Sequence, residues 1–364
     1  MSTIVLSAGG TGGHLFPAQA LAAELARRGR KIVVMTDARG TQYPTFFPGA
    51  EIEIVPSATL AGGLSLVTAP LKILAGVAVA LRKLSRIKPA AVVGFGGYPS
   101  LPVMLAAVIA RWPTAILAPD SVLGRANRLV ANSVNAIAGG LPLRRYAPDD
   151  MSKVVYTGNP VRPEAVAMKD APYERPTADG PLNLLVFGGS QGARALSETV
   201  PAAVALLPPQ MKARLSIVQQ CRPEDLDMVR AGYAGVKAEL AAFFGDMPQR
   251  IAKAHLVICR AGVGTVSELA VIGRPAILVP YPFATDDHQT TNALVLVEAG
   301  AGWMMPQSAL TPDRLAAQIE DAFADPQALA ARAAAAHALG KPDAAARFAD
   351  LVEKIGREKT RRPG

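Results

Sequence analysis

One local pattern occurs in both halves of this 364-residue chain: a short apolar run, a glycine-rich turn and a helical period. In the first copy, residues 3–8 predict a strand, Gly9–Gly13 a turn, residues 17–28 a helix and residues 31–35 a second strand. A strand, a helix and a parallel strand in this order form one βαβ unit. The opening of the chain therefore predicts a parallel sheet.

The second copy begins at Asn183, with the apolar run NLLVFGG, the turn SQGA, a helical period from Ala193 and a strand at residues 215–218. Residues 256–259 and 276–280 predict two more buried strands, each followed by a loop and a helix. Two such regions predict an α/β fold with two doubly wound, Rossmann-like parallel-sheet domains that face a cleft.

Length and proline content indicate where the domains divide. A chain of 364 residues is long enough for two domains. Residues 157–181 hold five prolines, which neither a helix nor a central strand would tolerate. We expect an N-terminal domain over residues 1–160, a C-terminal domain over residues 161–340, and a C-terminal helix with a basic tail over residues 341–364.

Composition excludes several classes of protein. Apolar residues make up 50% of the chain, which excludes disorder. Cys221 and Cys259 lie far apart in the sequence, so neither a disulfide scaffold nor a cysteine-built zinc site is expected. We expect the protein to reside in a reducing compartment. The longest apolar stretches, residues 73–81 and 101–110, are shorter than the roughly 18 residues that a membrane span needs. The N-terminus also lacks the basic start of a signal peptide.

Charge is unevenly distributed. Residues 1–150 carry 15 Lys and Arg against 7 Asp and Glu, so the first half holds most of the net charge of +9. No aromatic platform or basic recognition helix accompanies it, and a nucleic-acid partner is not expected. The acidic pairs Asp149-Asp150 and Asp286-Asp287 have diverging side chains, so a metal site is not expected either. Phosphate charge would then be met by helix N-termini and arginine.

The first glycine turn, Gly9–Gly13 followed by His14, nearly matches the dinucleotide fingerprint but has Leu15 where the last glycine is required. An NAD-dependent dehydrogenase, with Asp37 as its ribose-binding acid, is therefore a weaker alternative. His14 is either a turn histidine bonded to the local backbone or a general base. A histidine side chain with its ordinary pKa of about 6.5 can accept a proton near neutral pH.

Three more positions each allow a structural and a functional interpretation. Ser190, in the GGSQG turn, is either a helix N-cap or a diphosphate ligand beside bare backbone. Thr265 and Glu268 match a capping box, but a carboxylate there could instead accept both hydroxyls of a ribose. Arg162, after the NPV turn, is either a solvated linker charge or a cation that neutralises a leaving phosphate.

Six motifs follow one another along nearly the whole chain: GGTGGH at residues 9–14, GFGGYPS at 94–100, GNPVR at 158–162, GGSQGA at 188–193, TVSE at 265–268 and QTTNA at 289–293. Together they resemble the MurG family, the peptidoglycan N-acetylglucosaminyltransferases of glycosyltransferase family 28. Any one loop alone would be a weak signal, but the ordered set is specific. The resemblance implies a GT-B fold.

The resemblance also implies an activity. Enzymes of this family transfer N-acetylglucosamine from UDP-N-acetylglucosamine to lipid I, undecaprenyl-pyrophosphoryl-MurNAc-pentapeptide, and so form lipid II for peptidoglycan. The implied reaction is inverting and independent of metals and cofactors. The N-terminal domain would bind the acceptor and an anionic membrane surface, and the C-terminal domain the donor. The implied location is the cytoplasmic face of the inner membrane, bound peripherally, with other cell-wall synthesis proteins as further partners.

Motif by motif, the resemblance implies roles for single residues. His14 would be the catalytic base. The donor site would be formed by Thr11, Gly12, Gly13, Arg162, Ser190, Phe244, Val263, Gly264, Thr265, Val266, Ser267, Glu268 and Gln289. Arg162 and Ser190 would face the diphosphate. Glu268 would bind the ribose, the backbone of Phe244 the uracil, and Gln289 the sugar hydroxyls. Further sugar or acceptor contacts would come from Tyr98, Asp120 and Asn292.

One segment departs from the family pattern. Where the family usually has His-Glu-Gln-Asn, this chain has Leu117-Ala118-Pro119-Asp120. Asp120 can accept a hydrogen bond as an asparagine oxygen does, but it cannot donate one and would repel a nearby diphosphate. A non-catalytic, nucleotide-sugar-binding membrane scaffold is therefore a second alternative. The retained residues argue against it: His14, Arg162, Glu268 and Gln289.

Residues 71–84 predict an apolar helix that basic residues border: Lys72, Arg82, Lys83, Arg86 and Lys88. From the sequence pattern alone, this segment could equally be a core helix with solvated ends. If the acceptor is lipid-linked, as the resemblance implies, the segment predicts a surface that docks on an anionic membrane without inserting.

Overall fold

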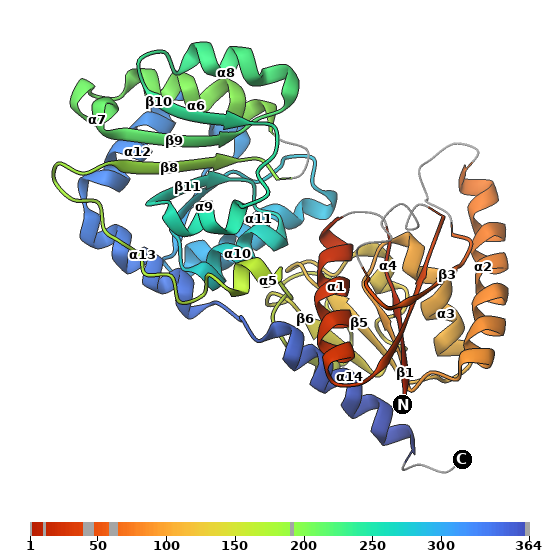
Figure 1. Cartoon of the computed structure of the whole chain (residues 1–364). Helices are drawn as coiled ribbons and strands as arrows, with labels where there is room; N and C mark the ends of the chain where they lie inside the picture. Colours follow the sequence, from red (N-terminus) through yellow and green to blue (C-terminus); the bar gives the residue numbers. More distant parts are fainter. Residues whose placement is uncertain (1, 10–11, 39–46, 58–64, 190–192, 361–364) are drawn as a thin grey trace. The chain divides into compact units, whose positions relative to one another are not determined.

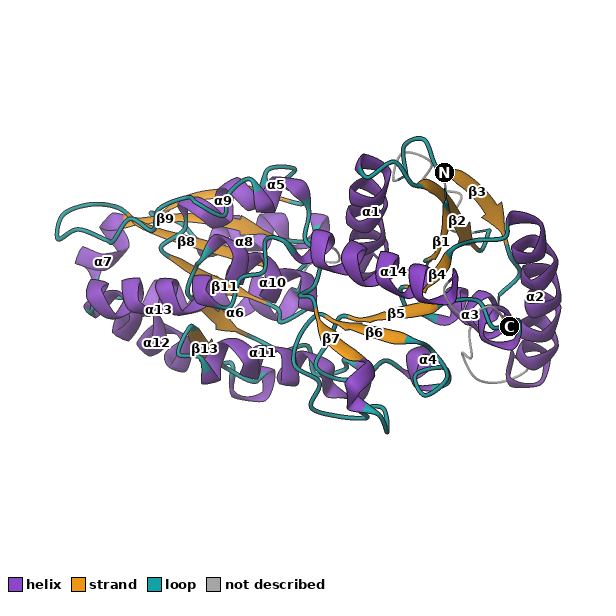
Figure 2. Cartoon of the chain, turned by 90° about the horizontal axis from the view of Figure 1, so that it is seen from below, coloured by secondary structure: helices purple, strands orange, loops and turns teal. Residues whose placement is uncertain are grey.

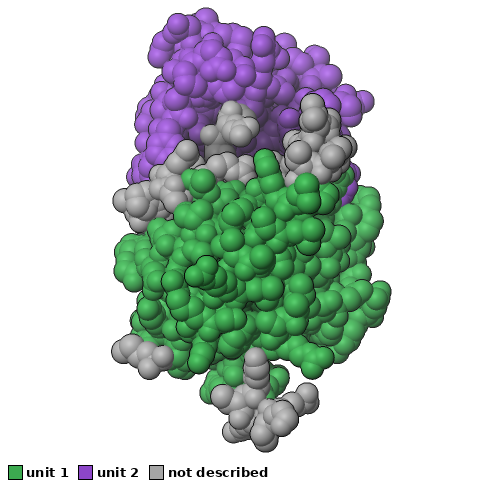
Figure 3. All heavy atoms as spheres, turned by 90° about the vertical axis from the view of Figure 1, so that its right-hand side faces the viewer, with its two compact units in different colours: residues 1–162, 343–364 green, residues 163–342 purple. Residues whose placement is uncertain are grey.

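The computed structural model describes residues 2–9, 12–38, 47–57, 65–189 and 193–360 (Figure 1). The chain forms two compact units, one of residues 1–162 with 343–364 and the other of residues 163–342 (Figure 3). The chain therefore passes between the units twice, after residue 162 and after residue 342.

The first unit contains a parallel sheet, which in the described residues has seven strands in the order β3-β2-β1-β4-β5-β6-β7. These strands are β1 (Thr3–Ser7), β2 (Lys31–Thr36), β3 (Glu51–Ile54), β4 (Ala91–Gly94), β5 (Thr114–Ala118), β6 (Ala136–Gly139) and β7 (Val154–Tyr156). The helices are α1 (Gly12–Arg27), α2 (Ser65–Ile87), α3 (Leu101–Ile109), α4 (Arg125–Arg128) and, from the end of the chain, α14 (Ala344–Thr360).

Alternate side chains of each strand contribute to two different cores. Ile4 and Leu6 of β1 lie in the cluster under α1 and α14, whereas Val5 lies in the cluster under α2 and α3. Figure 2 shows helices on both sides of this sheet. A parallel sheet covered on both faces needs strands that are apolar throughout, which is why short apolar runs predicted them.

The second unit repeats this architecture with six strands in the described residues, in the order β10-β9-β8-β11-β12-β13. They are β8 (Leu182–Phe187), β9 (Leu215–Gln220), β10 (Lys237–Ala241), β11 (Leu256–Cys259), β12 (Ala276–Leu278) and β13 (Gly302–Met304). The helices are α5 (Pro163–Val166), α6 (Arg194–Leu206), α7 (Pro209–Arg214), α8 (Leu226–Gly232), α9 (Met247–Lys253), α10 (Val263–Ile272), α11 (His288–Glu298), α12 (Pro312–Ala324) and α13 (Pro326–Ala338).

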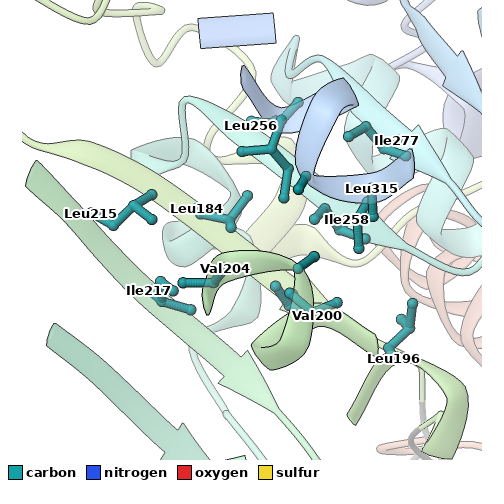
Figure 4. Close-up of a cluster of buried hydrophobic side chains, with 14 of the residues drawn as sticks. Leu184, Leu196, Val200, Val204, Leu215, Ile217, Leu256, Ile258, Ile277 and Leu315 are labelled. Carbon is teal, nitrogen blue, oxygen red and sulfur yellow. The ribbon is translucent and has the colours of Figure 1, made fainter. Parts of the chain in front are cut away.

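The core on one face of the second sheet joins aliphatic side chains from neighbouring strands and covering helices. Leu184, Ile217 and Ile258 extend from β8, β9 and β11 towards Val200 of α6 and Leu315 of α12 (Figure 4). These five side chains are at most 1% exposed. The α/β fold with two doubly wound parallel sheets is thus confirmed.

The first predicted helix differs from the observed one at its start. α1 begins at Gly12 rather than Pro17, so Pro17 lies inside the helix. Proline has no amide hydrogen for the carbonyl group four residues earlier, which here belongs to Gly13. Gly13 is exposed, so water can solvate that carbonyl. The glycine turn is therefore shorter than expected, and His14 belongs to the first turn of the helix.

The C-terminal helix α14 packs on α1 of the first unit. Arg28 donates hydrogen bonds to Glu24 at 2.7 Å and to Asp350 at 2.6 Å, and Arg30 donates to Glu353 at 2.7 Å. Phe348 is fully buried in the core between the helix and the sheet. Helix α14 is thus an integral part of the first unit.

Acid is expected to weaken the attachment of α14. The hydrogen bond from Arg27 lowers the pKa of Glu24 from 4.5 to about 2. Burial raises the pKa of Glu353, but hydrogen bonds from Arg30 and Arg28 outweigh it and the pKa is lowered. Carboxylates with lowered pKa values stabilise the fold above about pH 4.5, and this stabilisation is lost as the pH falls towards 2. The melting temperature should therefore drop more between about pH 5 and pH 3 in the wild type than in Glu353→Gln. Equal drops in the melting temperature of the two proteins would show that Glu353 does not stabilise the attachment of α14.

Candidate functional site

In the first unit, the strand order places a topological switch point between β1 and β4, where ligands bind in open α/β sheets. The ring of His14, at the start of α1, lies against the loop that follows β4. A β-carbon built on Gly96 would be 3.4 Å from Cε1 of His14, and one built on Gly97 would be 3.4 Å from Cδ2. Both glycines have positive φ, 84° and 72°, which other residues rarely adopt. The loop thus lets the imidazole rest directly on its backbone.

Asn127 of α4 lies on the same loop. Its Nδ2 is 3.5 Å from a β-carbon built on Gly96, and it donates a hydrogen bond of 2.7 Å to the carbonyl oxygen of Leu117. Asn127 is 3% exposed. Asn127 was not predicted as a site residue, but the structure places its amide and the His14 ring against the same glycine, Gly96.

Arg162 ends the first unit and lies beside α1. Its guanidinium carbon is 5.8 Å from the ring centroid of Phe16, two residues after His14. Arg162 is half-buried, so it is not a freely solvated linker charge. The structure therefore brings an arginine and the candidate base to the same end of one helix.

The structure describes three further predicted residues of this unit, Tyr98, Asp120 and Gly12. Tyr98, in the 3-10 helix η3 (Tyr98–Ser100), is half-buried and packs against the core under α2 and α3. Asp120 follows β5 and is also half-buried. Gly12 begins α1, whereas Thr11 lies outside the described residues.

The second unit has its switch point between β8 and β11. After β8, Gly189 has a φ of 85° and no described atom within 4 Å of the place where its β-carbon would be. Ser190 lies outside the described residues, so its N-cap and diphosphate interpretations both stay predictions. After β11, the chain passes through Gly262 into α10.

The start of α10 presents bare backbone to open space. Its N-cap is Gly262, without a capping side chain, and neither Gly262 nor Gly264 has a described atom within 4 Å of its missing β-carbon. A glycine within a helix costs about 1 kcal/mol relative to alanine, and packing within the described chain does not require it at Gly264. The unpaired N–H groups and the positive end of the helix dipole suit an anionic ligand that approaches closely.

The capping-box interpretation of Thr265 and Glu268 is wrong, because the helix begins at Val263 and Thr265 lies inside its first turn. Val263 and Val266 are buried and fix the helix on the core. Ser267 and Glu268 are each 8% exposed. Glu268 lies one turn after Gly264 on the same face, so a ligand on the bare backbone would reach its carboxylate.

Gln289 and Asn292 of α11 hold the loop that leads into α10. Oε1 of Gln289 accepts hydrogen bonds from the backbone N–H groups of Ala261, at 3.2 Å, and Tyr281, at 3.0 Å. Nδ2 of Asn292 donates to the carbonyl oxygen of Ala261 at 3.2 Å. Asn292 is fully buried and its amide holds the backbone of Ala261, while its expected sugar contact stays a prediction. Gln289 is half-buried at the edge of the loop.

Arg260 was not predicted as a site residue. It is 8% exposed and donates hydrogen bonds to the carbonyl oxygens of Val279 and Pro280 and to Oε1 of Gln307. Burial lowers the pKa of its guanidinium, but an arginine remains charged under all ordinary conditions. This buried cation immediately precedes the loop and adds positive potential to its end of the sheet.

Phe244 follows β10 and is 7% exposed. The guanidinium carbon of Arg250 lies 4.0 Å from its ring centroid, and Arg250 in turn pairs with Glu239 and Asp246. This layer fixes the ring, and with it the backbone of Phe244. Among the described residues, no group of three or more His, Cys, Asp and Glu side chains could hold a metal ion.

Two family models cover most of the chain: the glycosyltransferase family 28 N-terminal domain matches residues 4–138 and the family 28 C-terminal domain matches residues 183–348. The chain belongs to glycosyltransferase family 28. It is similar over nearly its full length to the UDP-N-acetylglucosamine--N-acetylmuramyl-(pentapeptide) pyrophosphoryl-undecaprenol N-acetylglucosamine transferase of Rhodospirillum centenum, with 51% identity over 356 residues, 97% of this chain and 94% of the relative.

Two further comparisons agree. The transferase of the same name from Paramagnetospirillum magneticum is 50% identical over 354 residues, 96% of this chain and 95% of the relative. The crystal structure of Acinetobacter baumannii MurG matches with a TM-score of 0.81 at 32% identity, covering 97% of this chain and 100% of that chain. The resemblance to the MurG family is confirmed.

Proposed function

We propose that this family 28 protein transfers N-acetylglucosamine from UDP-N-acetylglucosamine to lipid I and so forms lipid II for peptidoglycan. One observation carries the proposal: relatives with this activity in their names match the chain at about 50% identity from end to end. The glycine turn of the first unit leads into a histidine at the ligand edge of its sheet, as this reaction needs. A dehydrogenase would need the last glycine of the dinucleotide fingerprint, which Leu15 replaces.

The proposal divides the chemistry between the units. In the second unit, the N-terminus of α10 receives the diphosphate and Glu268 the ribose. In the first unit, His14 removes the proton of the acceptor hydroxyl as the anomeric carbon develops positive charge. One displacement inverts that carbon, and the new charge on the departing UDP is met by helix N–H groups and Arg162.

Release of UDP in the presence of a lipid I analogue tests this function. The purified chain should release UDP from UDP-N-acetylglucosamine only when the acceptor is present, and mass spectrometry should show the disaccharide product. If the chain binds UDP-N-acetylglucosamine but gives no product, the membrane-scaffold alternative holds instead.

The same UDP-release assay, run at several acceptor concentrations, tests the departure from the family pattern at residues 117–120. The KM of Asp120→Asn for the acceptor should be equal to or lower than that of the wild type, because the amide restores a hydrogen-bond donor and removes a negative charge.

The membrane surface proposed for the acceptor unit lies on α2. Val77, Ala80 and Leu84 are buried against the core, so one face of α2 is a core helix. Leu71 and Leu74 are 69% and 64% exposed. In the part of the chain that the structure describes, no helix combines the length and apolarity of a membrane span.

The basic residues around α2 divide into two groups. Lys83 and Arg86 pair with Glu53 of β3. Lys72, Arg82 and Lys88 are exposed, and Lys72 directly follows Leu71 in the sequence. Exposed leucines beside exposed cations suit peripheral binding to anionic lipid, on the inner-membrane face where the acceptor would be presented.

Leu71→Ser/Leu74→Ser is expected to weaken binding to vesicles of phosphatidylglycerol and phosphatidylcholine by at least about tenfold, because two exposed apolar side chains are lost. Sedimentation with vesicles measures this. Raising the salt concentration should weaken wild-type binding, because screening reduces the attraction of the exposed cations. Leu206→Ser, which changes a leucine of α6 that is 55% exposed, is the matched control and should bind as the wild type does. Binding that depends on neither lipid charge nor salt would contradict the proposal.

A further inference from the structure

An exposed pair of aromatic rings lies on the loop between β12 and α11. Tyr281 and Phe283 are 44% and 79% exposed. Their rings meet edge to face, with centroids 5.6 Å apart and an interplanar angle of 71°. Two exposed rings that pack on each other form a contiguous apolar surface, which on a soluble unit marks a ligand or partner.

This aromatic loop is joined to the candidate donor loop by hydrogen bonds. Oε1 of Gln289 accepts from the N–H groups of both Tyr281 and Ala261, which bridges the two loops through one side chain. Arg260 donates to the carbonyl oxygen of Pro280 at 3.1 Å, and its guanidinium carbon lies 5.5 Å from the Tyr281 ring centroid. The aromatic pair is thus fixed beside the residues that precede α10.

The rest of the loop is also held in one conformation. Asp286 and Asp287 both have a φ of 55°, a left-handed conformation that costs free energy in residues other than glycine. The N–H of Ala284 donates to the carbonyl oxygen of Tyr281, and Thr290 donates to the carboxylate of Asp287 at 2.6 Å. A loop that holds two rings in place before a ligand arrives spends less conformational entropy on binding.

We infer that Tyr281 and Phe283 form a stacking platform for the ring of an N-acetylhexosamine. The inference rests on the proposed function, in which both the donor and the muramyl acceptor carry such a ring. The C–H face of a pyranose and the methyl group of its acetamide are apolar and pack on aromatic rings, while the hydroxyl groups need polar partners such as the amide of Gln289. The bridge through Gln289 to Ala261 assigns the platform to the donor sugar.

The difference between the affinities for UDP and for UDP-N-acetylglucosamine measures the contribution of the sugar to binding. In the full chain, Tyr281→Ala/Phe283→Ala should weaken the affinity for UDP-N-acetylglucosamine by about tenfold and leave the affinity for UDP unchanged, as titration calorimetry would show. Leu206→Ala is the control, because Leu206 is 55% exposed at the C-terminal end of α6 in the same unit, opposite the helix end that faces the ligand edge of the sheet, and should affect neither ligand. Tyr281→Phe/Phe283→Tyr keeps both rings and should retain wild-type affinity.

The remaining outcomes are also distinct. If donor affinity is unchanged but the KM for the acceptor rises about tenfold, the assignment to the donor sugar is overturned, and the platform binds the ring of the muramyl substrate instead. An equal loss for UDP and UDP-N-acetylglucosamine would overturn the inference, because it would show only a displaced nucleotide loop. Unchanged donor affinity with unchanged acceptor KM would overturn it as well. A wild-type chain that fails to bind UDP-N-acetylglucosamine would count against the proposed function instead.

Discussion

Replacing His14 with alanine is expected to lower kcat by about 100- to 10,000-fold, the usual contribution of a general base. The affinity for UDP-N-acetylglucosamine should change little, because the main donor-binding residues proposed here belong to the second unit. Steady-state UDP release measures kcat, and calorimetry with the donor alone measures the affinity. A turn histidine that only packs on Gly96 and Gly97 would produce a different result, a lower melting temperature with turnover retained.

Chemical rescue separates the two roles of His14. If the imidazole acts as a base, imidazole added to the buffer should restore part of the activity of His14→Ala, because the cavity left beside the glycine loop has the size of the missing ring. A structural loss would not respond to added imidazole at fixed pH. Full turnover in the alanine variant without rescue would show that another group takes the proton.

The local patterns predicted the elements that carry both candidate sites. Residues 256–259 are β11 as expected, and the glycine turn after them leads into α10. A strand buried on both faces must be a short apolar run, and the turn at its end must leave the sheet, so both signals are local in sequence. The two switch points, between β1 and β4 and between β8 and β11, depend on the spatial order of the strands, which is not a local signal and comes from the structure.

Burial and long-range pairing could not be predicted in this way. The docking of α14 depends on ion pairs between Arg28 and Glu353, which are 325 positions apart in sequence. Asn292 belongs to the same short motif as Gln289, yet only the fold shows that its side chain is fully buried against Ala261. The Thr265 pattern failed because a capping box is defined by spacing alone, and the helix had already begun two residues earlier.

Glu268→Gln is expected to weaken the affinity for UDP by about 10- to 100-fold. The exchange keeps the size of the side chain but removes a charge, and a hydrogen bond to a charged acceptor is worth about 1.5 to 3 kcal/mol. Glu268 is 8% exposed on the face of α10 that begins with the bare backbone of Gly264, so its carboxylate is partly desolvated. Titration calorimetry with UDP gives the affinity, and the melting temperature without ligand shows whether the variant folds. Glu320→Gln, at an exposed position of α12 in the same unit, should bind UDP as the wild type does.

A ligand lacking one ribose hydroxyl identifies what Glu268 binds. The wild type should lose affinity when 2′-deoxy-UDP or 3′-deoxy-UDP replaces UDP, whereas Glu268→Gln should lose much less, because the interaction has already been weakened. Such coupling between one side chain and one hydroxyl cannot arise from a change in helix stability, which would weaken all three ligands alike. If the variant discriminates between UDP and the deoxy ligands as strongly as the wild type, Glu268 does not bind the ribose, and the carboxylate serves only to hold the start of α10.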